Sequence, residues 1–391
     1  MSNKPLKHIR ILEIGGYIAA PYATSLLCTL GAEVVKVERP GGGDPFRRDL
    51  NELSPYFIQY NAGKLSLGVD LKATEGIELI KALIPRFDVV LENLRPGKMD
   101  AIGLSHEECA RLRPDLIYAS VTGFGNGGPL QFRPAYDAIG QAFGGLNSIL
   151  SDRGAAQLSG TCLADLITGV TNAAGILAAL VGRAATGSGL RMETSMMEAV
   201  STLTIDAVTQ YVDSGHTDPT RRSRHFQAQN FCLKTSSGDE IAIHLSSSVK
   251  FWRGLIAAIN RPELDDDPRF DTFAKRQENY DAIVAIVESE FLTKPAAEWE
   301  RLLTEADVPF APVLGVAGYI EHPQTKWLDV IEPEANGVAL VRAPWRFDGV
   351  RPERAPAAPR VGQDTRKIAS EVLDEVRIEE LVACGVLFTD D

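Results

Sequence analysis

Residues 9–38, IRILEIGGYIAAPYATSLLCTLGAEVVKVE, contain the alternation that decides the fold. The apolar run at 9–14 predicts a strand that ends at Gly15 and Gly16. Residues 22–31 predict a helix that ends at Gly31, where a left-handed C-cap favours glycine, and 34–38 predict the next strand. Two strands joined by a helix indicate the start of a parallel sheet.

The same alternation continues to about residue 121. Further strands are predicted at 65–70, 88–93 and 116–121, and helices at 74–84 and 105–112. This pattern predicts an α/β protein with an open, doubly wound, Rossmann-like sheet. Ligands of such sheets bind beyond the carboxyl ends of the strands, so the loops that follow these strands form the expected binding edge.

After residue 200 the pattern changes to that of a smaller α+β unit. It comprises two predicted strands (FCLKT and EIAIHL, from 231–235 and 240–245) and helices at 249–259, 275–292 and 296–306. Residues 206–225 look like a connection, residues 320–360 are rich in proline, and helices are expected at 364–374 and 377–384. We therefore expect a large domain from 1–200 and 346–391, linkers at 201–225 and 319–345, and a small domain at 226–318.

Composition narrows the classes of protein that the chain can represent. Its 391 residues suit two domains, and a net charge of −12 argues against nucleic acid or an anionic membrane as partner. Five scattered cysteines without a CxxC pair favour a reducing cytoplasm and indicate neither disulfides nor a zinc ribbon. The start of the chain lacks the apolar run of a signal peptide. The most apolar segment, 163–181, is interrupted by polar residues and predicts a buried helix.

Several motifs suggest sites that their context does not support. Residues 123–128 (GFGNGG) satisfy G-x-G-x-x-G, but Pro129 and a polar stretch follow in place of the helix that a dinucleotide site needs. His225, Cys232 and His244 match no zinc spacing. Ser120 and Ser195 lack a nucleophile elbow, so a serine hydrolase is not indicated. We expect no metal.

Asp165 is the candidate for covalent chemistry. It lies in the first turn of a helix predicted at 165–181, where an ordinary acid gains roughly 0.3–1 kcal/mol from the helix dipole. That interpretation is the simpler one for this segment alone. The alternative is a nucleophile, because a helix start that keeps a dehydrated carboxylate ionised makes it competent toward a thioester.

Cations follow three successive predicted strands: Arg39 after the second, Lys72 after the third, and Arg95 and Lys98 after the fourth. Exposed lysine and arginine are common, so each one alone indicates little. Together they would place positive charge at the binding edge, which suits the pyrophosphate and 3′-phosphate of coenzyme A.

Ten blocks in order along the chain resemble one family. They are ILEIGGYIAAPYATSLLCTLGAEVVKVERPGGGDPFR, YNAGKLSLGVDLKATEG, DVVLENLRPGKMDAIGLS, LIYASVTGFGNGGP, PAYDAIGQAFGGL, GTCLADLITGVTNAAGILAAL, ATGSGLRMETSMMEA, DDDPRFDTFAKRQENYDAIV, AAEWERLLTEADVPFAPV and APRVGQDTRKI. The chain thus resembles, over nearly its whole length, the class III CoA-transferases, the family named for carnitine and bile-acid CoA-transferases that includes formyl-CoA transferase.

The resemblance implies a large α/β domain built from both chain ends, a small domain, and two subunits interlocked as a homodimer. It implies that Asp165 is the catalytic aspartate. Residues matching the family's CoA contacts are Ile18, Ala19, Arg39, Val69, Leu71, Lys72, Asn93 and Leu94. Two positions depart from formyl-CoA transferase: Ile18 replaces a glutamine, and Ala101 replaces an arginine that contacts phosphate, for which Lys98 or Arg95 could substitute.

The implied reaction moves CoA from an acyl-CoA to a free acid through an aspartyl anhydride and an aspartyl-CoA thioester. It uses acyl-CoA as a substrate and no resident cofactor. The cation for a second carboxylate would be Arg133 or an arginine within 221–224. The first alternative is α-methylacyl-CoA racemase, whose His-Asp pair falls at Tyr136 and Asp137, and tyrosine is a poor base at neutral pH. The second is a non-catalytic CoA-binding protein.

Overall fold

The computed structural model describes residues 4–48, 54–152, 154–332 and 338–390. The chain forms two compact units. The large unit comprises Met1–Asn147, Leu158–Val208 and Leu328–Asp391, and the small unit comprises Ser148–Gln157 and Thr209–Trp327.

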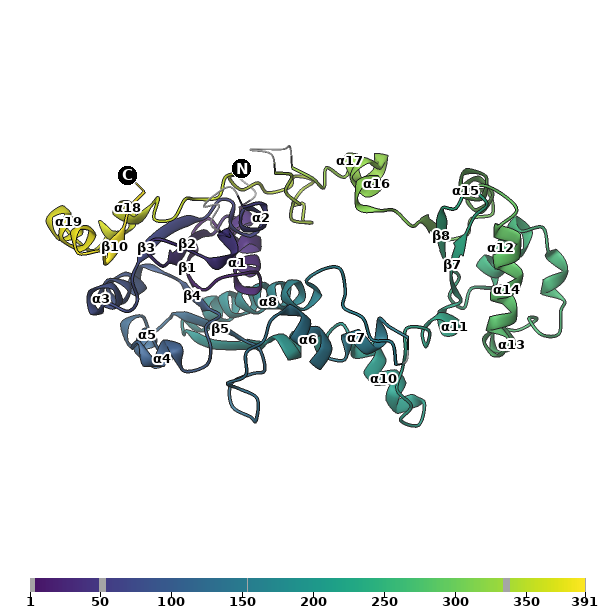
Figure 1. Ribbon diagram of the computed structural model, residues 1–391, viewed down its shortest axis with the longest axis horizontal. Helices are drawn as coiled ribbons and strands as arrows, with labels where there is room; N and C mark the ends of the chain where they lie inside the picture. Colours follow the sequence, from purple (N-terminus) through teal and green to yellow (C-terminus); the bar gives the residue numbers. More distant parts are fainter. Residues whose placement is uncertain (1–3, 49–53, 153, 333–337, 391) are drawn as a thin grey trace. The chain divides into compact units, whose positions relative to one another are not determined.

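The large unit is built on a seven-stranded sheet with the order β10-β3-β2-β1-β4-β5-β6 (Figure 1). The strands are β1 (Arg10–Ile14), β2 (Glu33–Glu38), β3 (Leu65–Val69), β4 (Val89–Glu92), β5 (Ile117–Thr122), β6 (Leu190–Ser195) and β10 (Leu387–Phe388). All neighbours are parallel except β10, which is antiparallel to β3. Leu12 of β1 lies opposite Val35 of β2 and Val90 of β4. The predicted doubly wound sheet is confirmed, and its direction of growth reverses between β1 and β4.

Helices cover both faces of this sheet, which explains why its central strands are almost wholly buried. The helices on one face are α1 (Ala19–Thr29) and α8 (Leu163–Thr186). Those on the other face include α3 (Thr74–Leu83), α5 (His106–Leu112), α18 (Thr365–Ala369) and α19 (Glu375–Ala383). The C-terminal helices thus complete a core that the N-terminal strands begin.

Helix α8 packs closely along α1. A side chain at Gly169 would approach Tyr22 Cδ1 within 2.7 Å and the Ala19 carbonyl oxygen within 3.0 Å, so the helices meet where α8 has no side chain. By length and mean hydropathy (1.6), α8 alone among the helices of the described residues could cross a membrane. Core helices meet the same criterion, and the burial of Ala173 and Ile176 in the core agrees with the predicted buried helix.

The small unit has a three-stranded antiparallel sheet in the order β7-β8-β9. Its strands are β7 (Asn230–Lys234), β8 (Glu240–His244) and β9 (Phe310–Pro312). Three helices, α12 (Val249–Ala258), α14 (Tyr280–Phe291) and α15 (Ala296–Glu305), pack on it and enclose Trp252 and Trp299. The Trp299 ring stacks on Phe291 with centroids 4.2 Å apart.

Several elements differ from the prediction. The helix expected at 275–292 is two helices, α13 (Phe273–Glu278) and α14, because the Asn279 amide at the junction donates to the Arg269 and Lys275 carbonyls. The expected connection 206–225 includes α10 (Ile205–Asp213), and the helix at 364–374 is only α18. Elements not predicted include β6, β9, β10, α2 (Pro55–Asn61), α4 (Lys98–Ala101), α6 (Asp137–Phe143), α7 (Leu146–Ile149), α9 (Met196–Ser201), α11 (His225–Ala228), α16 (Val316–Glu321) and α17 (Pro323–Trp327).

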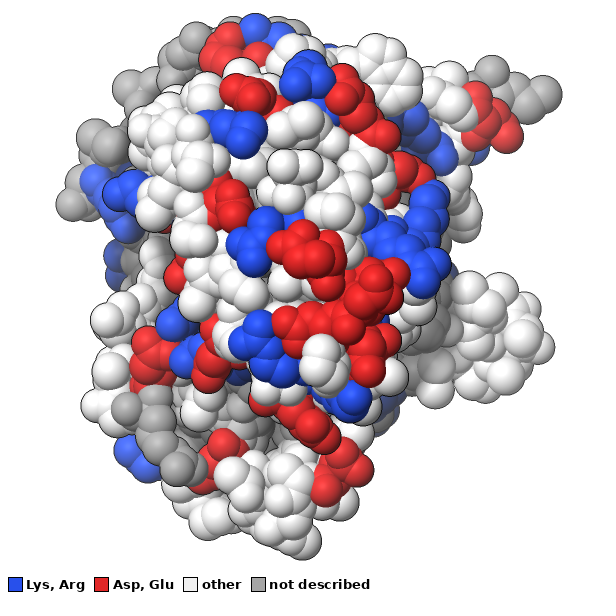
Figure 2. All heavy atoms as spheres, turned by 90° about the vertical axis from the view of Figure 1, so that its right-hand side faces the viewer, with Lys and Arg blue, Asp and Glu red and all other residues white. Residues whose placement is uncertain are grey.

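Charged side chains are mixed on the face drawn in Figure 2, where lysine and arginine alternate with aspartate and glutamate. Many charged side chains of the small unit form exposed pairs, such as Arg253 with Asp265 (2.8 Å) and Arg301 with Glu305 (2.7 Å). Such pairs contribute little to stability and cancel one another at a distance. This face therefore carries acidic groups beside its basic ones.

Candidate active site

The loops that follow β1 and β4 meet at the reversal point of the sheet, and Asn93 joins them. Its Oδ1 accepts the Gly16 N–H (3.0 Å), and its Nδ2 donates to the Gly16 carbonyl (2.9 Å). A Cβ at Gly15 would lie 2.1 Å from Asn93 Oδ1, so residue 15 has to be glycine. Asn93, predicted from the resemblance as a CoA contact, therefore also holds the floor of the crevice where doubly wound sheets bind ligands.

A cavity with a volume of ≈ 600 Å³ opens along this crevice. Its lining includes seven of the predicted CoA-binding residues: Arg39, Val69, Leu71, Lys72, Asn93, Leu94 and Lys98. Arg95 lines it too, so four cations surround one cavity. Two of its acids are already paired, Glu38 with Arg47 (2.6 Å) and Asp44 with Lys36 (2.8 Å). The cavity thus suits an anionic ligand with an apolar part, and we call it the nucleotide cavity.

A second cavity of ≈ 370 Å³ adjoins the first, and we call it the acyl cavity. Tyr17, Asn93, Leu94 and Arg95 line both cavities. The acyl cavity brings together the remaining predicted site residues: Ile18, Ala19, Arg133, Tyr136, Asp137 and Asp165. A ligand long enough to extend from one cavity to the other would connect the cations to Asp165.

Asp165 is half-buried in the first turn of α8. Burial, together with the neighbouring charge of Asp137, raises the pKa of its carboxyl to about 7. The expectation that the helix start keeps Asp165 ionised is therefore wrong in direction. The physical reason is burial and the nearby Asp137 charge, while the N–H groups of Ala164 and Asp165 donate to Asp137 Oδ1 (2.9 and 3.2 Å) and not to Asp165. One carboxylate oxygen of Asp137, the Sγ of Cys162 and one carboxylate oxygen of Asp165 all lie within 4.8 Å of one another.

A buried charge network supports the loop beneath the acyl cavity. Lys36 and Lys64 contact the Glu13 carboxylate at 2.6 and 2.7 Å, and Lys36 also contacts Asp44 at 2.8 Å. Asp44 Oδ1 in turn accepts the N–H of Tyr17 (3.1 Å), whose φ of 65° lies in the left-handed region. Burial alone would raise the pKa of Glu13, but the two lysines outweigh it and hold the pKa at about 2.

This charge network was not predicted from the sequence, although the sequence carries a signal for it. Glu13 and Lys36 interrupt apolar strands that are buried on both faces, where a charge needs a partner. Pairing them across adjacent strands requires the register, which the structure supplies: Glu13 lies opposite Lys36.

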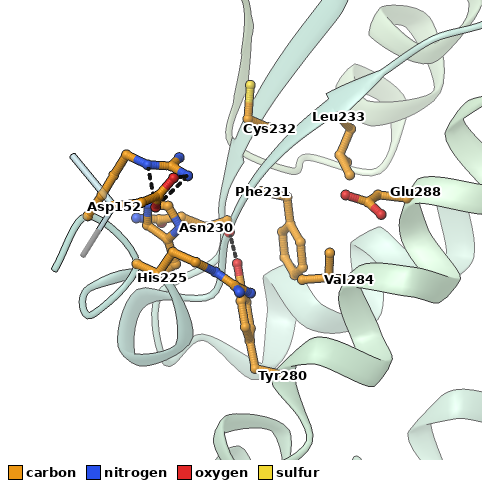
Figure 3. Close-up of a pocket in the computed structure, with 11 residues that line it drawn as sticks. Asp152, His225, Asn230, Phe231, Cys232, Leu233, Tyr280, Val284 and Glu288 are labelled. Atoms are coloured by element: carbon orange, nitrogen blue, oxygen red, sulfur yellow. Dashed lines mark hydrogen bonds and ion pairs between the residues drawn. The ribbon is translucent and has the colours of Figure 1, made fainter. Parts of the chain in front are cut away.

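Two of the arginines in the 221–224 cluster line a separate cavity within the small unit (Figure 3). Arg221 contacts Asp152 at 3.0 Å and Arg222 contacts Asp281 at 2.7 Å, so both guanidinium groups already have carboxylate partners. His225 and Cys232 line the same cavity (Figure 3), and burial together with the two arginines lowers the pKa of His225.

The fold and the adjoining cavities define an α/β protein of the class that binds a nucleotide-bearing ligand at a sheet reversal point. Comparison with known proteins identifies the family. The sequence pattern of CoA-transferase family III matches residues 6–365, and the chain belongs to that family.

Similar proteins carry CoA-transferase names. The mouse succinyl-CoA:glutarate CoA-transferase is 32% identical over 99% of this chain and 91% of its own length. The acetyl-CoA:oxalate CoA-transferase of Acetobacter aceti is 32% identical over 94% of this chain and 95% of its own. The chain is accordingly a CoA-transferase, which acts on CoA substrates, and the predicted family is confirmed.

Two solved structures share the fold. Rv3272 from Mycobacterium tuberculosis has a TM-score of 0.84 and 28% identity, covering 94% of this chain and 99% of its own. A CaiB/BaiF family protein from Brucella suis has a TM-score of 0.82 and 30% identity, covering 95% and 100%. The large, mainly parallel sheet and the small antiparallel sheet match this fold.

Proposed function

We propose that the enzyme transfers CoA through covalent intermediates on Asp165. An oxygen of the Asp165 carboxylate attacks the thioester carbonyl of the donor acyl-CoA. The C–S bond breaks, CoA leaves as a thiolate, and an acyl-aspartyl anhydride remains. The observation that carries this proposal is the position of Asp165 in a cavity that shares lining residues with a second cavity lined by four cations.

The thiolate then attacks the aspartyl carbonyl carbon, which releases the donor acid as a carboxylate and leaves Asp165 joined to CoA as a thioester. The acceptor carboxylate attacks this thioester, forms a second anhydride and expels the CoA thiolate. Attack of that thiolate on the acceptor's acyl carbon yields the new acyl-CoA and restores Asp165. Each step exchanges one activated acyl group for another, so no ATP is consumed, and N–H donors would stabilise the tetrahedral oxyanions.

The nucleotide of CoA is proposed to occupy the nucleotide cavity. Arg39, Lys72 and Lys98 would pair with its phosphates, and Val69 and Leu71 would contact the adenine. Ile18 and Ala19 would contact the pantetheine end beside Asp165. The proposal gives Lys98 or Arg95 the phosphate contact that Ala101 lacks.

Small dicarboxylic acids are the proposed acid partners. Glutarate and oxalate occur in the names of the relatives, and the acyl cavity offers Arg95 and Arg133 for a second carboxylate. Screening succinyl-, acetyl- and formyl-CoA against mono- and dicarboxylic acids would identify the pair.

A homodimer in the cytoplasm remains part of the proposal, and so do the domain boundaries predicted from the sequence. Helix α10 supports the dimer, because Val208 and Val212 are 59% and 61% exposed on one side of it in the single chain. Apolar side chains on one face of an exposed helix are typical of an interface. Light scattering at micromolar concentration should give twice the mass of the chain.

The relatives named above carry transferase names, and no contact among the described residues favours the racemase alternative. Tyr136, at the position of the racemase histidine, lies edge-to-face against Tyr17 with centroids 5.4 Å apart. Deuterium entering the α-carbon of a 2-methylacyl-CoA without an acceptor acid would favour the racemase.

Trapping tests the covalent mechanism directly. Hydroxylamine added during turnover, followed by peptide mass analysis, should place the modification on Asp165. Asp165→Ala should abolish exchange of labelled acid into acyl-CoA while the circular dichroism spectrum is retained. Modification of another side chain, or turnover without any, would exclude the proposal.

A further inference from the structure

Asp137 makes the strongest contacts to the start of α8, although it belongs to α6. Its Oδ1 accepts the N–H groups of Ala164 and Asp165, and its Oδ2 accepts Gln141 Nε2 at 2.6 Å. Cys162, the N-cap residue of α8, contributes no side-chain cap. Asp137 therefore caps the N-terminus of α8 in place of the N-cap residue.

Hydrogen bonds of Gln141 hold Asp137 in this orientation. Gln141 is buried, with 2% of its surface exposed, and its Oε1 accepts the Ser159 hydroxyl at 2.8 Å. The same Gln141 Nε2 also donates to the Thr161 carbonyl at 3.2 Å. Gln141 can therefore present its N–H only toward Asp137 and the loop that leads into α8.

As a consequence, few hydrogen-bond donors near Asp165 are left to contact its carboxylate. Within the part of the chain that the structure describes, the helix-start N–H groups are taken by Asp137, and no hydrogen bond to the Asp165 carboxylate is formed. Its oxygens stay in the acyl cavity, and the Asp137 charge lies beside them. Such a carboxylate is a better nucleophile than one whose lone pairs are engaged by a helix start.

We propose that Asp137 is a positioning residue of the transfer reaction: it occupies the cap of α8 and thereby leaves the Asp165 carboxylate uncapped, beside a like charge, for attack on the thioester. Attack forms the bond between an Asp165 oxygen and the acyl carbon, breaks the C–S bond and moves the negative charge onto the departing thiolate. The acylated Asp165 is neutral, so its repulsion with Asp137 ends at this step. The inference rests on the proposed role of Asp165.

Other groups surround the Asp165 carboxyl and bear on its titration. They are Asp137 from α6, Cys162 before α8, Tyr60 from α2, and the residues Tyr17, Arg95, Arg133 and Tyr136 that line the acyl cavity. Of these, Asp137 is the one whose charge raises the pKa of Asp165, in the same direction as burial. Removing the Asp137 charge should consequently lower that pKa.

The test compares Asp137→Asn, which keeps an oxygen for the two N–H groups, with Asp137→Ala, which removes the cap. Glu198→Gln is the matched control, because Glu198 also lies at a helix start of the large unit but caps α9 with Ser195. The carboxyl of Asp165 is titrated by carbon-13 NMR of aspartate-labelled protein and assigned from the spectrum of Asp165→Asn. In Asp137→Asn we expect the midpoint to fall by roughly one pH unit from its value near 7, and in Glu198→Gln we expect no change.

A second measurement is the rate of Asp165 acylation by succinyl-CoA at pH 8, followed by intact-protein mass. Asp137→Asn should acylate roughly tenfold more slowly with little change in the KM for acyl-CoA, and Asp137→Ala should be slower still. An unchanged midpoint in Asp137→Asn, or a lowered midpoint with unchanged acylation, would overturn the inference. If the wild-type enzyme turns over without any label on Asp165, the proposed function fails instead, whatever the titration shows.

Discussion

Burial disfavours the charged form of two carboxylates of the large unit, yet the two acids end in opposite states. Glu13 lies in β1 between Lys36 and Lys64, and its pKa is lowered to about 2. Asp165 lies at the start of α8 beside another acid, and its pKa is raised to about 7. Burial raises the pKa of both carboxyls; the two lysines outweigh it at Glu13, whereas Asp137 adds to it at Asp165.

The comparison separates a structural charge from a reactive one. Two cations satisfy both oxygens of Glu13, so it links β1 to β2 and, through Lys36 and Asp44, supports the loop of Tyr17. Asp165 is left incompletely satisfied at the surface of a cavity, where a perturbed pKa indicates a functional group. The two acids should therefore respond in opposite ways to neutralisation: removing the charge should destabilise the fold at Glu13 and abolish activity at Asp165.

The largest expected effect is on catalysis. Asp165→Ala should lower kcat on the order of 10⁴-fold or more, because no other group takes over the covalent step. The matched control is Asp281→Ala, which removes an exposed acid from the first turn of α14. Initial rates of acyl-CoA formation measure both variants, and equal losses in the two would contradict the assignment.

The next effect is on stability. Glu13→Gln should lower the free energy of unfolding by about 3–5 kcal/mol, because Lys36 and Lys64 would remain buried without their shared carboxylate. The comparison variant, Glu33→Gln, breaks an exposed pair with Arg10 and should cost about 0–1 kcal/mol. Urea denaturation measures both. Similar midpoints for the two variants would mean that the network contributes little.

A smaller effect runs in the opposite direction. A raised pKa means that the folded protein favours the neutral form of Asp165, so this group reduces stability as the pH rises from about 4 to about 7. Asp165→Asn removes the charge and should make the protein more stable than wild type by on the order of 2 kcal/mol at pH 8. Below pH 4 the difference should vanish. Thermal unfolding across this range provides the measurement, and a gain independent of pH would disprove the linkage.

The smallest expected effect concerns the nucleotide cavity. Arg39→Ala should raise the KM for acyl-CoA roughly five- to tenfold and leave kcat nearly unchanged, because the contact is made equally in ground and transition states. Lys81→Ala, which removes a cation of α3 that pairs with Glu78, is the control. Steady-state kinetics with varied acyl-CoA separates the two parameters; a fall in kcat alone would place Arg39 closer to the chemistry.

Local pattern was sufficient for much of the large unit. The strands at 9–14, 34–38, 65–70 and 116–121 were predictable because their apolar runs are short and end at glycine or polar loops. The pattern did not predict β6, because it is half-exposed and lacks a continuous apolar run. It also failed for α10, whose apolar residues lie among polar ones and are exposed in the single chain.

The candidate residues were named from the sequence through their resemblance to a family, but their arrangement was not predictable. The resemblance named Asp165 and Asp137 separately, and the contact of Asp137 with the start of α8 joins residues 27 positions apart. Likewise, Lys64 reaches Glu13 across 51 positions. Hydrogen bonds of this kind depend on tertiary packing, to which local propensity is insensitive.

The sequence by itself determined the parallel α/β architecture, the family and the identity of the candidate nucleophile, because periodicity and motifs are local properties of the chain. Tertiary structure alone decided the charge state of that nucleophile. Its pKa depends first on burial and then on the groups that the fold brings near it, and here the fold buried the carboxyl, placed a second acid beside it and assigned the helix start to that acid.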